Sequence, residues 1–187
     1  MTEPARAVTV RPLEWRDCSE LGENYRLAYR ERDRGEPIWL HLLGTAPAVP
    51  DEVVWFSGLY RAVLAGNAVC RVAEVDGRAV GLVSVHRVGP DRDAENGHVG
   101  ELGILIHPEH RGRGIGSALF ASVLEACRGT FELVRLSVFS ENARGIALYR
   151  KFGFVPYGHL PAHARRAGKY YDAELMILDL RAPSPKG

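Results

Sequence analysis

The sequence predicts a single α/β domain, with a mixed sheet of six to seven strands and about four helices. Apolar runs of strand length alternate along the chain with segments of helical periodicity. Asp76-Gly77 separates two of these runs, which indicates a hairpin and antiparallel pairing. A helical segment separates the runs 98–106 and 131–139, so these two strands should be parallel.

Composition limits the class of protein. A chain of 187 residues is a usual length for one domain, which we expect over residues 1–180, followed by a disordered tail at 181–187. The net charge of +1 gives no indication of a nucleic-acid or membrane-surface partner. No apolar run has the length of a membrane span, and the N-terminus lacks the apolar core of a signal peptide. Three unpaired cysteines, Cys18, Cys70 and Cys127, indicate a reducing, cytoplasmic location.

The first elements follow from local patterns. Residues 8–13 alternate in polarity and predict a strand, and Asp17 with Glu20 has the spacing of a capping box at the start of a helix. The expected inner face of that helix consists of Leu21, Tyr25, Ala28 and Tyr29. Residues 35–50 contain three prolines and two glycines and predict a loop. The loop's apolar side chains either pack on the core or wall a substrate pocket; they include Trp39, His41, Leu42 and Leu43.

The middle of the chain continues with a second helix that Asp51 would cap and Gly66-Asn67 would end. Its expected inner face consists of Val53, Phe56, Tyr60, Val63 and Leu64. Two strands flank the hairpin turn, at 68–75 and 78–88, and the strand at 98–106 should pair back on the second of them.

The last third predicts a strand at 131–139 and a helix at 142–152. Gly153 should end that helix. We then expect a short strand at 154–157, a loop at 158–168 and a closing strand at 170–180.

The most informative stretch is the strand, loop and helix between residues 101 and 127. Pro108 ends the apolar strand, because proline has no N–H for a ladder. The glycine-rich run Arg111-Gly112-Arg113-Gly114-Ile115-Gly116 then leads into a helix that no Ser, Thr, Asp or Asn caps. The first N–H groups of a helix lack internal partners and carry partial positive charge, so a phosphate or pyrophosphate is the expected ligand. The glycines let that ligand approach the backbone.

Two common phosphate loops do not fit. A Walker loop needs a lysine that is missing here, and the dinucleotide fingerprint fails because Ser117 or Leu119 stands at its sixth position. The pattern Arg111-x-x-Gly114-x-Gly116 instead resembles the pyrophosphate loop of the GNAT superfamily, the acetyl-CoA-dependent N-acetyltransferases. The order of elements along the whole chain is similar to that family's layout.

The resemblance implies a sheet that splays between the strand ending at Ile106 and the strand at 131–139, with acetyl-CoA in the gap. Backbone groups of Ile104, Leu105 and Ile106 would bind its pantetheine. The diphosphate would lie on the loop, which consists of Arg111, Gly112, Arg113, Gly114, Ile115, Gly116 and Ser117. Residues 142–154 are similar to the family's Asn-x-x-(Gly/Ala)-x-x-Leu-Tyr-x-x-x-Gly-Phe pattern. That likeness implies that Asn142 contacts the pantetheine and that the Tyr149 hydroxyl acts as the acid toward the thiolate sulfur.

Amide formation also needs a group that takes the proton of the amine, because a lysine-like amine with a pKa of about 10.4 is mostly charged at neutral pH. Glu101 is the first candidate, since its apolar neighbours would raise its pKa, and the resemblance implies a carboxylate near this place. Alternatively, Glu101 is a strand-edge carboxylate paired with an arginine. His98 is the second candidate base. Cys127 lies on the buried face of its helix, where a thiol is inert, so we expect direct transfer in a ternary complex.

The acceptor is less well defined by the sequence. Residues 165–176 are similar to the ending of GNAT members that acetylate amino acids and small amines, with one tyrosine more before Asp172. Arg165 or Arg166 would hold a carboxylate there, or belong to a solvated turn. We therefore predict transfer to a primary amine of a small molecule: an amino acid, a polyamine or an amine antibiotic. A protein N-terminal or lysine acetyltransferase and a non-catalytic CoA-binding sensor are the alternatives. No histidine has zinc-ligand spacing, so no metal is expected, and the resemblance leaves a homodimer open.

Overall fold

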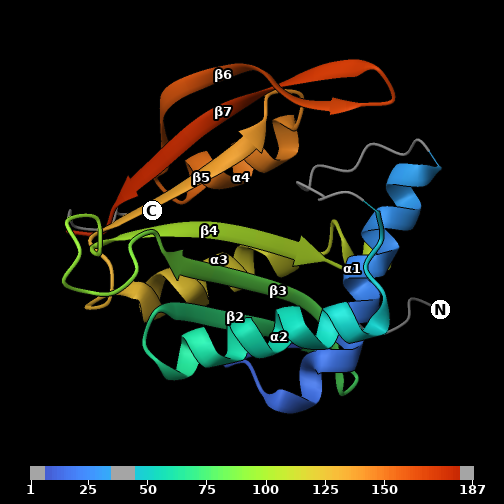
Figure 1. Cartoon of the computed structure of the whole chain (residues 1–187). Coiled ribbons are helices and arrows are strands. Elements are labelled where there is room, and N and C mark those ends of the chain that lie inside the picture. Colours follow the sequence, from blue (N-terminus) through green and yellow to red (C-terminus); the bar gives the residue numbers. More distant parts are fainter. Residues whose placement is uncertain (1–6, 35–44, 182–187) are drawn as a thin grey trace.

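A computed structural model describes residues 7–34 and 45–181 of the chain, and it confirms the predicted α/β class (Figure 1). One mixed sheet of seven strands has the order β1-β2-β3-β4-β5-β7-β6. The strands are β1 (Val8–Arg11), β2 (Ala68–Val75), β3 (Arg78–Arg87), β4 (Val99–Ile106), β5 (Leu133–Phe139), β6 (Val155–Arg166) and β7 (Lys169–Asp179). The α-helices are α1 (Cys18–Asp33), α2 (Val49–Leu64), α3 (Ile115–Cys127) and α4 (Ala143–Lys151), with short 3-10 turns at Trp15–Asp17 and Pro108–His110.

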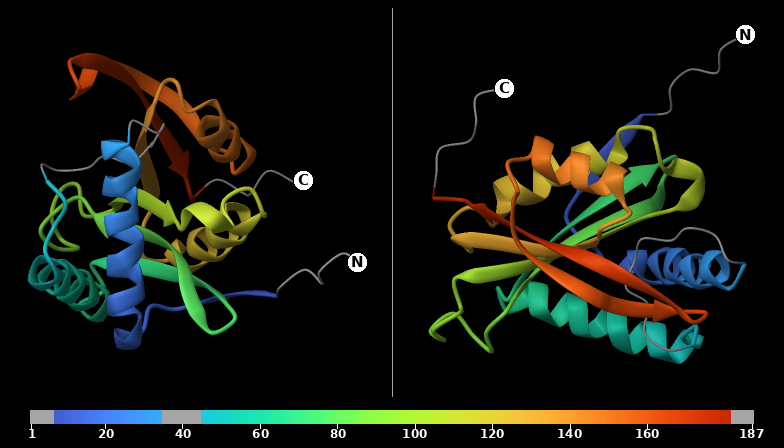
Figure 2. Two further views of the ribbon diagram at one scale, coloured as in Figure 1. Left: turned by 90° about the vertical axis from the view of Figure 1, so that its right-hand side faces the viewer. Right: turned by 90° about the horizontal axis from the view of Figure 1, so that it is seen from above.

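Helices cover both faces of the sheet. Seen from above, α1 and α2 lie on one side and α3 and α4 on the other (Figure 2). The larger apolar cluster joins α3 and α4 to the sheet through side chains such as Phe120, Val123 and Leu136. A smaller cluster under α1 and α2 includes Leu21 and Phe56. The middle of the sheet is therefore covered on both faces, as expected for helices that cross between its strands, whereas the edge strand β6 is mostly exposed.

The pairing of the strands confirms the hairpin and the parallel step. β2 and β3 are antiparallel, and their turn has positive φ angles of 51° at Asp76 and 76° at Gly77. β3 and β4 are also antiparallel, whereas β4 and β5 are parallel. The predicted splay is present: β4 and β5 pair at residues 99–101 and 133–135, and the described residues show no ladder between them beyond that point. The ribbons of β4 and β5 visibly diverge there (Figure 1).

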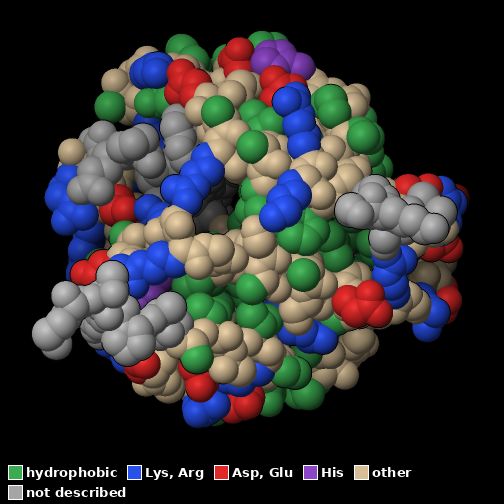
Figure 3. Space-filling view, turned by 180° about the vertical axis from the view of Figure 1, so that it is seen from behind, with side chains coloured by type: hydrophobic (Ala, Val, Ile, Leu, Met, Phe, Trp, Pro, Cys, Tyr) green, Lys and Arg blue, Asp and Glu red, His purple; other side chains and the backbone are tan. Residues whose placement is uncertain are grey.

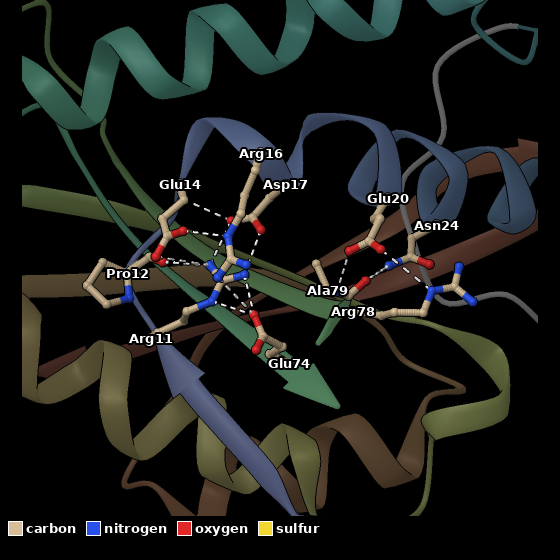
Figure 4. Close-up of polar contacts among 10 residues, drawn as sticks. All are labelled: Arg11, Pro12, Glu14, Arg16, Asp17, Glu20, Asn24, Glu74, Arg78 and Ala79. Atoms are coloured by element: carbon tan, nitrogen blue, oxygen red, sulfur yellow. Dashed lines mark hydrogen bonds and ion pairs between the residues drawn. The ribbon is translucent and has the colours of Figure 1, made fainter. Parts of the chain in front are cut away.

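The predicted capping box at the first helix is wrong. The Asp17 carboxylate is buried and accepts hydrogen bonds from Arg11 Nη2 and Nη1, at 2.7 and 2.9 Å, and from the backbone N–H of Glu14, at 2.8 Å (Figure 4). Asp17 thus ties the end of β1 to the 3-10 turn that precedes α1. The Asp17 carboxylate therefore accepts three hydrogen bonds from other groups, and it does not cap the N-terminus of α1.

Glu20 also has another role than the predicted one. Its Oε2 accepts the backbone N–H of Ala79 at 2.6 Å, while Asn24 Nδ2 donates to the Ala79 carbonyl at 3.0 Å (Figure 4). These two bonds anchor α1 to β3, so the inner face of α1 is fixed by polar contacts as well as by buried Leu21 and Ala28.

The second helix starts earlier than the sequence predicted. It begins at Val49, and Asp51 lies inside its first turn, where Oδ2 accepts the N–H of Ala48 at 3.0 Å. Phe56 is buried, as predicted for the inner face, and so is Leu59, whereas Val53 and Leu64 are exposed and do not belong to that face.

The segment predicted as a short strand and a loop, 154–168, is instead mostly strand β6. β6 is the edge strand of the sheet, where proline is tolerated because one row of N–H groups needs no partner. Its register against β7 shifts between Pro156 and Gly158 and again between Leu160 and Ala164. The Pro and Gly residues that indicated a loop therefore mark irregularities within a strand.

Part of the expectations lies outside the described residues, namely the loop residues Trp39, His41, Leu42 and Leu43 and the tail beyond Arg181. Among the helices that the structure describes, none combines the length and the apolar character that crossing a membrane requires.

Candidate active site

A cavity of about 390 Å³ lies at the open end of the gap between β4 and β5. The loop after β4, the start of α3 and the first turns of α4 surround it. Most of the predicted site residues line it: Ile104, Leu105, Ile106, Arg111, Gly112, Gly114, Gly116, Ser117, Asn142 and Tyr149. On the face opposite to that of Figure 1, a hollow bordered by Lys and Arg side chains is visible (Figure 3).

The glycine-rich loop presents a row of unbonded amides to this cavity. Gly112 and Gly114 both have φ of +83°, a left-handed conformation that favours glycine. The backbone N–H groups of residues 112–117 have no hydrogen-bond acceptor among the described residues. The first helical bond of α3 is the one from the Ala118 N–H to the Gly114 carbonyl. Consecutive free amides at a helix N-terminus form an anion site.

The absence of a side chain at Gly116 matters for the packing of the helices as well as for the approach of a ligand to the loop. A Cβ at this position would come within 3.2 Å of Leu148 Cδ2 and 3.5 Å of Ile106 Cδ1. The missing side chain therefore lets the start of α3 approach α4. Ile115, in contrast, is buried in the core with 2% exposure and does not line the cavity.

The two arginines of the loop differ from each other. Arg113 is exposed and does not line the cavity. The Arg111 guanidinium points to the protein: Nη1 and Nη2 donate to the two carboxylate oxygens of Glu31, each at 2.8 Å, and Nε donates to the Ile106 carbonyl at 3.0 Å. Arg111 therefore has its donors engaged within the fold rather than directed at a ligand.

Arg144 is a cavity residue that the sequence analysis missed as a functional residue. It lies in the first turn of α4, and its Nη2 is 3.1 Å from the position that a Cβ on Gly112 would occupy. Its guanidinium thus lies over the glycine loop, and among the described residues it has no hydrogen bond or ion pair. The sequence did contain a signal for Arg144. An arginine two residues after Asn142 lies in the first turn of the helix, where a cation is unfavourable because it opposes the helix dipole.

Asn142 and Tyr149 lie on α4, as predicted. Asn142 caps the helix, because its Oδ1 accepts the Gly145 N–H at 2.9 Å, which leaves its amide N–H₂ group for a ligand. Tyr149 is 8% exposed and packs on Phe120 and Phe154. Burial raises the pKa of the Tyr149 hydroxyl to about 12, so it stays protonated at neutral pH. Its hydroxyl has no hydrogen-bond partner within the described part of the chain.

Glu101 does not have the apolar environment expected for it. Strand alternation buries Leu102 but leaves the Glu101 side chain 55% exposed, and its Oε2 accepts from Arg135 Nη2 at 2.9 Å. This is the alternative of a carboxylate paired with an arginine, located where β4 and β5 begin to part. The second candidate base, His98, lies in the turn before β4, at the closed end of the gap.

His86 is a titratable neighbour of Glu101 that the sequence analysis did not consider. It faces Glu101 across the β3–β4 ladder. Its ring reaches solvent, yet the surrounding protein desolvates it enough to lower the pKa of the imidazole, and the Glu101 carboxylate opposes that shift less strongly. Burial raises the pKa of the Cys70 and Cys127 thiols to about 12, which disfavours the nucleophilic thiolate form at neutral pH.

Comparison with known proteins agrees with this geometry. Residues 15–154 match the model of the acetyltransferase (GNAT) family. The chain is 33% identical over 107 residues to the L-amino acid N-acetyltransferase AaaT of Escherichia coli (strain K12), a match that covers 56% of the chain and 64% of AaaT. It is 27% identical over 166 residues to the L-amino acid N-acyltransferase MnaT of the same strain, covering 88% and 89% of the two chains.

A solved structure shares the fold. The phosphinothricin acetyltransferase from Sinorhizobium meliloti, in complex with acetyl-CoA, superposes with a TM-score of 0.76 at 22% identity, over 96% of this chain and 94% of that one. Because the family model covers most of its length, this chain belongs to the GNAT family of acetyltransferases. It is therefore an acyltransferase.

Proposed function

We propose that this acetyltransferase moves the acetyl group of acetyl-CoA to a primary amine of a small molecule, by direct transfer in a ternary complex. The row of unbonded amides at residues 112–117 supports this most strongly, because it offers a diphosphate site at the mouth of a gap that can take the pantetheine. The inert, buried thiols of Cys70 and Cys127 favour direct transfer over an acyl-enzyme.

In the proposed reaction, the amine nitrogen attacks the thioester carbonyl carbon, a C–N bond forms and the C–S bond breaks. The amine loses a proton to Glu101, which lies where β4 and β5 part. Tyr149 donates a hydrogen bond to the departing sulfur. Asn142, through its amide N–H₂, and the backbone of Ile104, Leu105 and Ile106 hold the pantetheine.

Arg144 supplies the charge that Arg111 cannot, because the Arg111 guanidinium is bound to Glu31. We expect Arg144→Gln to raise the Kd for acetyl-CoA by about 10- to 100-fold, the loss of one hydrogen bond between charged groups. The loss should shrink at high salt, because salt screens an exposed charge. Calorimetry at two salt concentrations measures both effects.

Arg150→Gln is the matched control, since Arg150 is exposed on the same helix and does not line the cavity. Equal affinities of the Arg144→Gln variant and the unmodified protein would remove Arg144 from the site.

Glu101→Gln should affect both the titration of His86 and the rate of acetyl transfer. In the unmodified protein we expect an NMR titration of the His86 imidazole to have its inflection below the ordinary histidine value of about 6.5, because desolvation lowers the pKa of this side chain. In Glu101→Gln the carboxylate that raises this pKa is gone, so the inflection should move to still lower pH. The maximal rate should drop because the amine loses its proton acceptor. An unchanged rate of acetyl transfer across the pH range in Glu101→Gln would clear Glu101 of the base role.

A small-molecule acceptor is supported by two relatives whose names specify L-amino acids. Transfer to a protein N-terminus or lysine, and CoA binding without catalysis, are the competing functions. Free thiol should be followed while the protein is mixed with acetyl-CoA and a panel of amino acids, polyamines, amine antibiotics and peptides. Thiol release with small amines supports the proposal, release with peptides alone supports protein acetylation, and thermal stabilisation by CoA without turnover indicates a sensor.

We also propose a cytoplasmic location, which the three free cysteines favour. A homodimer remains a prediction, and light scattering on the purified protein tests it.

A further inference from the structure

The last turns of α1 carry a buried charge that the proposed reaction does not use. Glu31 is 5% exposed, which is rare for a carboxylate unless it is paired. Both of its oxygens accept from Arg111, each at 2.8 Å, in the bidentate geometry that makes such pairs strong. The two residues are 80 positions apart in the chain.

The same guanidinium also binds the end of β4. Arg111 Nε donates to the Ile106 carbonyl, and the Arg111 backbone N–H donates to the Pro108 carbonyl at 3.2 Å. One side chain therefore joins α1, the end of β4 and the first residue of the glycine loop.

The rest of the loop has little to define its shape. Gly112 and Gly114 have wide conformational freedom, and their neighbours' amides lack partners within the described chain. With Arg111 held by Glu31, the loop starts from a fixed point and its amides converge on the cavity. Without Glu31, the Arg111 side chain, which is 35% exposed, would lose its partner and turn toward the solvent.

We infer that Glu31 is a positioning residue for the acetyl donor: through Arg111 it fixes the glycine loop in the shape that receives the diphosphate. The inference rests on the proposed function, since it assigns the diphosphate to this loop. Glu31 does not touch the ligand, so its effect must depend on Arg111 and on the presence of a diphosphate in the donor.

The test compares two donors, acetyl-CoA and S-acetylpantetheine, which lacks the diphosphate. Glu31→Gln keeps the shape of the side chain and removes its charge. It should lower kcat/KM for acetyl-CoA about tenfold through KM, and change kcat/KM for S-acetylpantetheine less than about twofold. Glu31→Asp keeps the charge on a shorter side chain, so its kcat/KM for acetyl-CoA should lie between the values of the unmodified protein and of Glu31→Gln. This variant also provides the test if Glu31→Gln does not fold.

Glu23→Gln is the matched control, because Glu23 lies on the same helix and pairs with Arg26 and Arg30 away from the loop. Glu23→Gln should leave kcat/KM unchanged for both donors. In an Arg111→Gln background, the further change Glu31→Gln should not lower kcat/KM for acetyl-CoA any more, because its effect passes through Arg111.

Equal losses with both donors would show a general structural role and overturn the inference, as would an unchanged KM for acetyl-CoA in Glu31→Gln and Glu31→Asp. An additive loss in the Arg111→Gln background would also overturn it. Failure of the proposed function itself is distinct: the unmodified protein would then release no thiol from either donor.

Discussion

Gly114→Asp is expected to abolish measurable acetyl-CoA binding, whereas Gly114→Asn weakens it far less. Gly114 lies between the free amides of the loop, and a Cβ built on it meets no other atom within 4 Å. A side chain there therefore enters the space of the ligand without disturbing the core. A carboxylate next to a diphosphate costs several kcal/mol, which corresponds to a loss of affinity of at least about 100-fold.

The asparagine variant separates charge from strain. Gly114 has φ of +83°, and any side chain costs energy there, although Asn and Asp tolerate this conformation best. Because Asn and Asp have nearly the same size, the ratio of their dissociation constants isolates the electrostatic part. Calorimetry with CoA should show this ratio falling as salt rises. Equal dissociation constants for the two variants would mean that no phosphate lies at residue 114.

The loop and its helix could be predicted from the sequence because their signal is local. Pro108, three closely spaced glycines and the apolar face of α3 lie within a few turns of one another, and no distant residue changes their meaning. The same holds for the hairpin at Asp76-Gly77 and for the start of the last helix near Asn142.

The features that the sequence analysis missed depend on distant partners. Arg111 was expected to belong to the loop that carries the diphosphate, but its guanidinium is bound by Glu31, which lies 80 positions away in the chain. Glu101 has apolar neighbours in the chain, yet strand alternation turns it to the opposite face from Leu102, where the parallel register places Arg135 beside it. Pairing across a sheet, and not local polarity, decides the environment of such a residue.

The local signals for a capping box and for a loop misled for a related reason. Asp17 has the right spacing for a cap, but Arg11 offers it a stronger, charged partner. Residues 158–168 contain turn-forming residues, but their position at the sheet edge lets them remain in β6. Strand order is a property of the whole fold, so these two outcomes needed the three-dimensional structure.

Tyr149→Phe should lower kcat about 10- to 100-fold with little change in the Kd for acetyl-CoA, which is the loss of one hydrogen bond to a developing charge. The raised pKa of about 12 keeps the hydroxyl protonated, so it is able to donate. A thiol has a pKa of about 8.5, so full proton transfer from Tyr149 to the thiolate would be uphill. The hydroxyl therefore acts mainly by stabilising the leaving sulfur with a hydrogen bond in a site sheltered from water.

The variant should not be less stable than the unmodified protein. The Tyr149 hydroxyl has no partner among the described residues, so removing it deletes no hydrogen bond of the fold, and the melting temperature should stay equal or rise. Tyr157→Phe, which removes a hydroxyl from an exposed position on β6, is the matched control and should keep the full rate. Single-turnover kinetics separates the chemical step from product release. An unchanged single-turnover rate in Tyr149→Phe would assign the stabilisation of sulfur to water, whereas a lower rate together with a lower melting temperature would point to packing on Phe120 rather than to the hydroxyl.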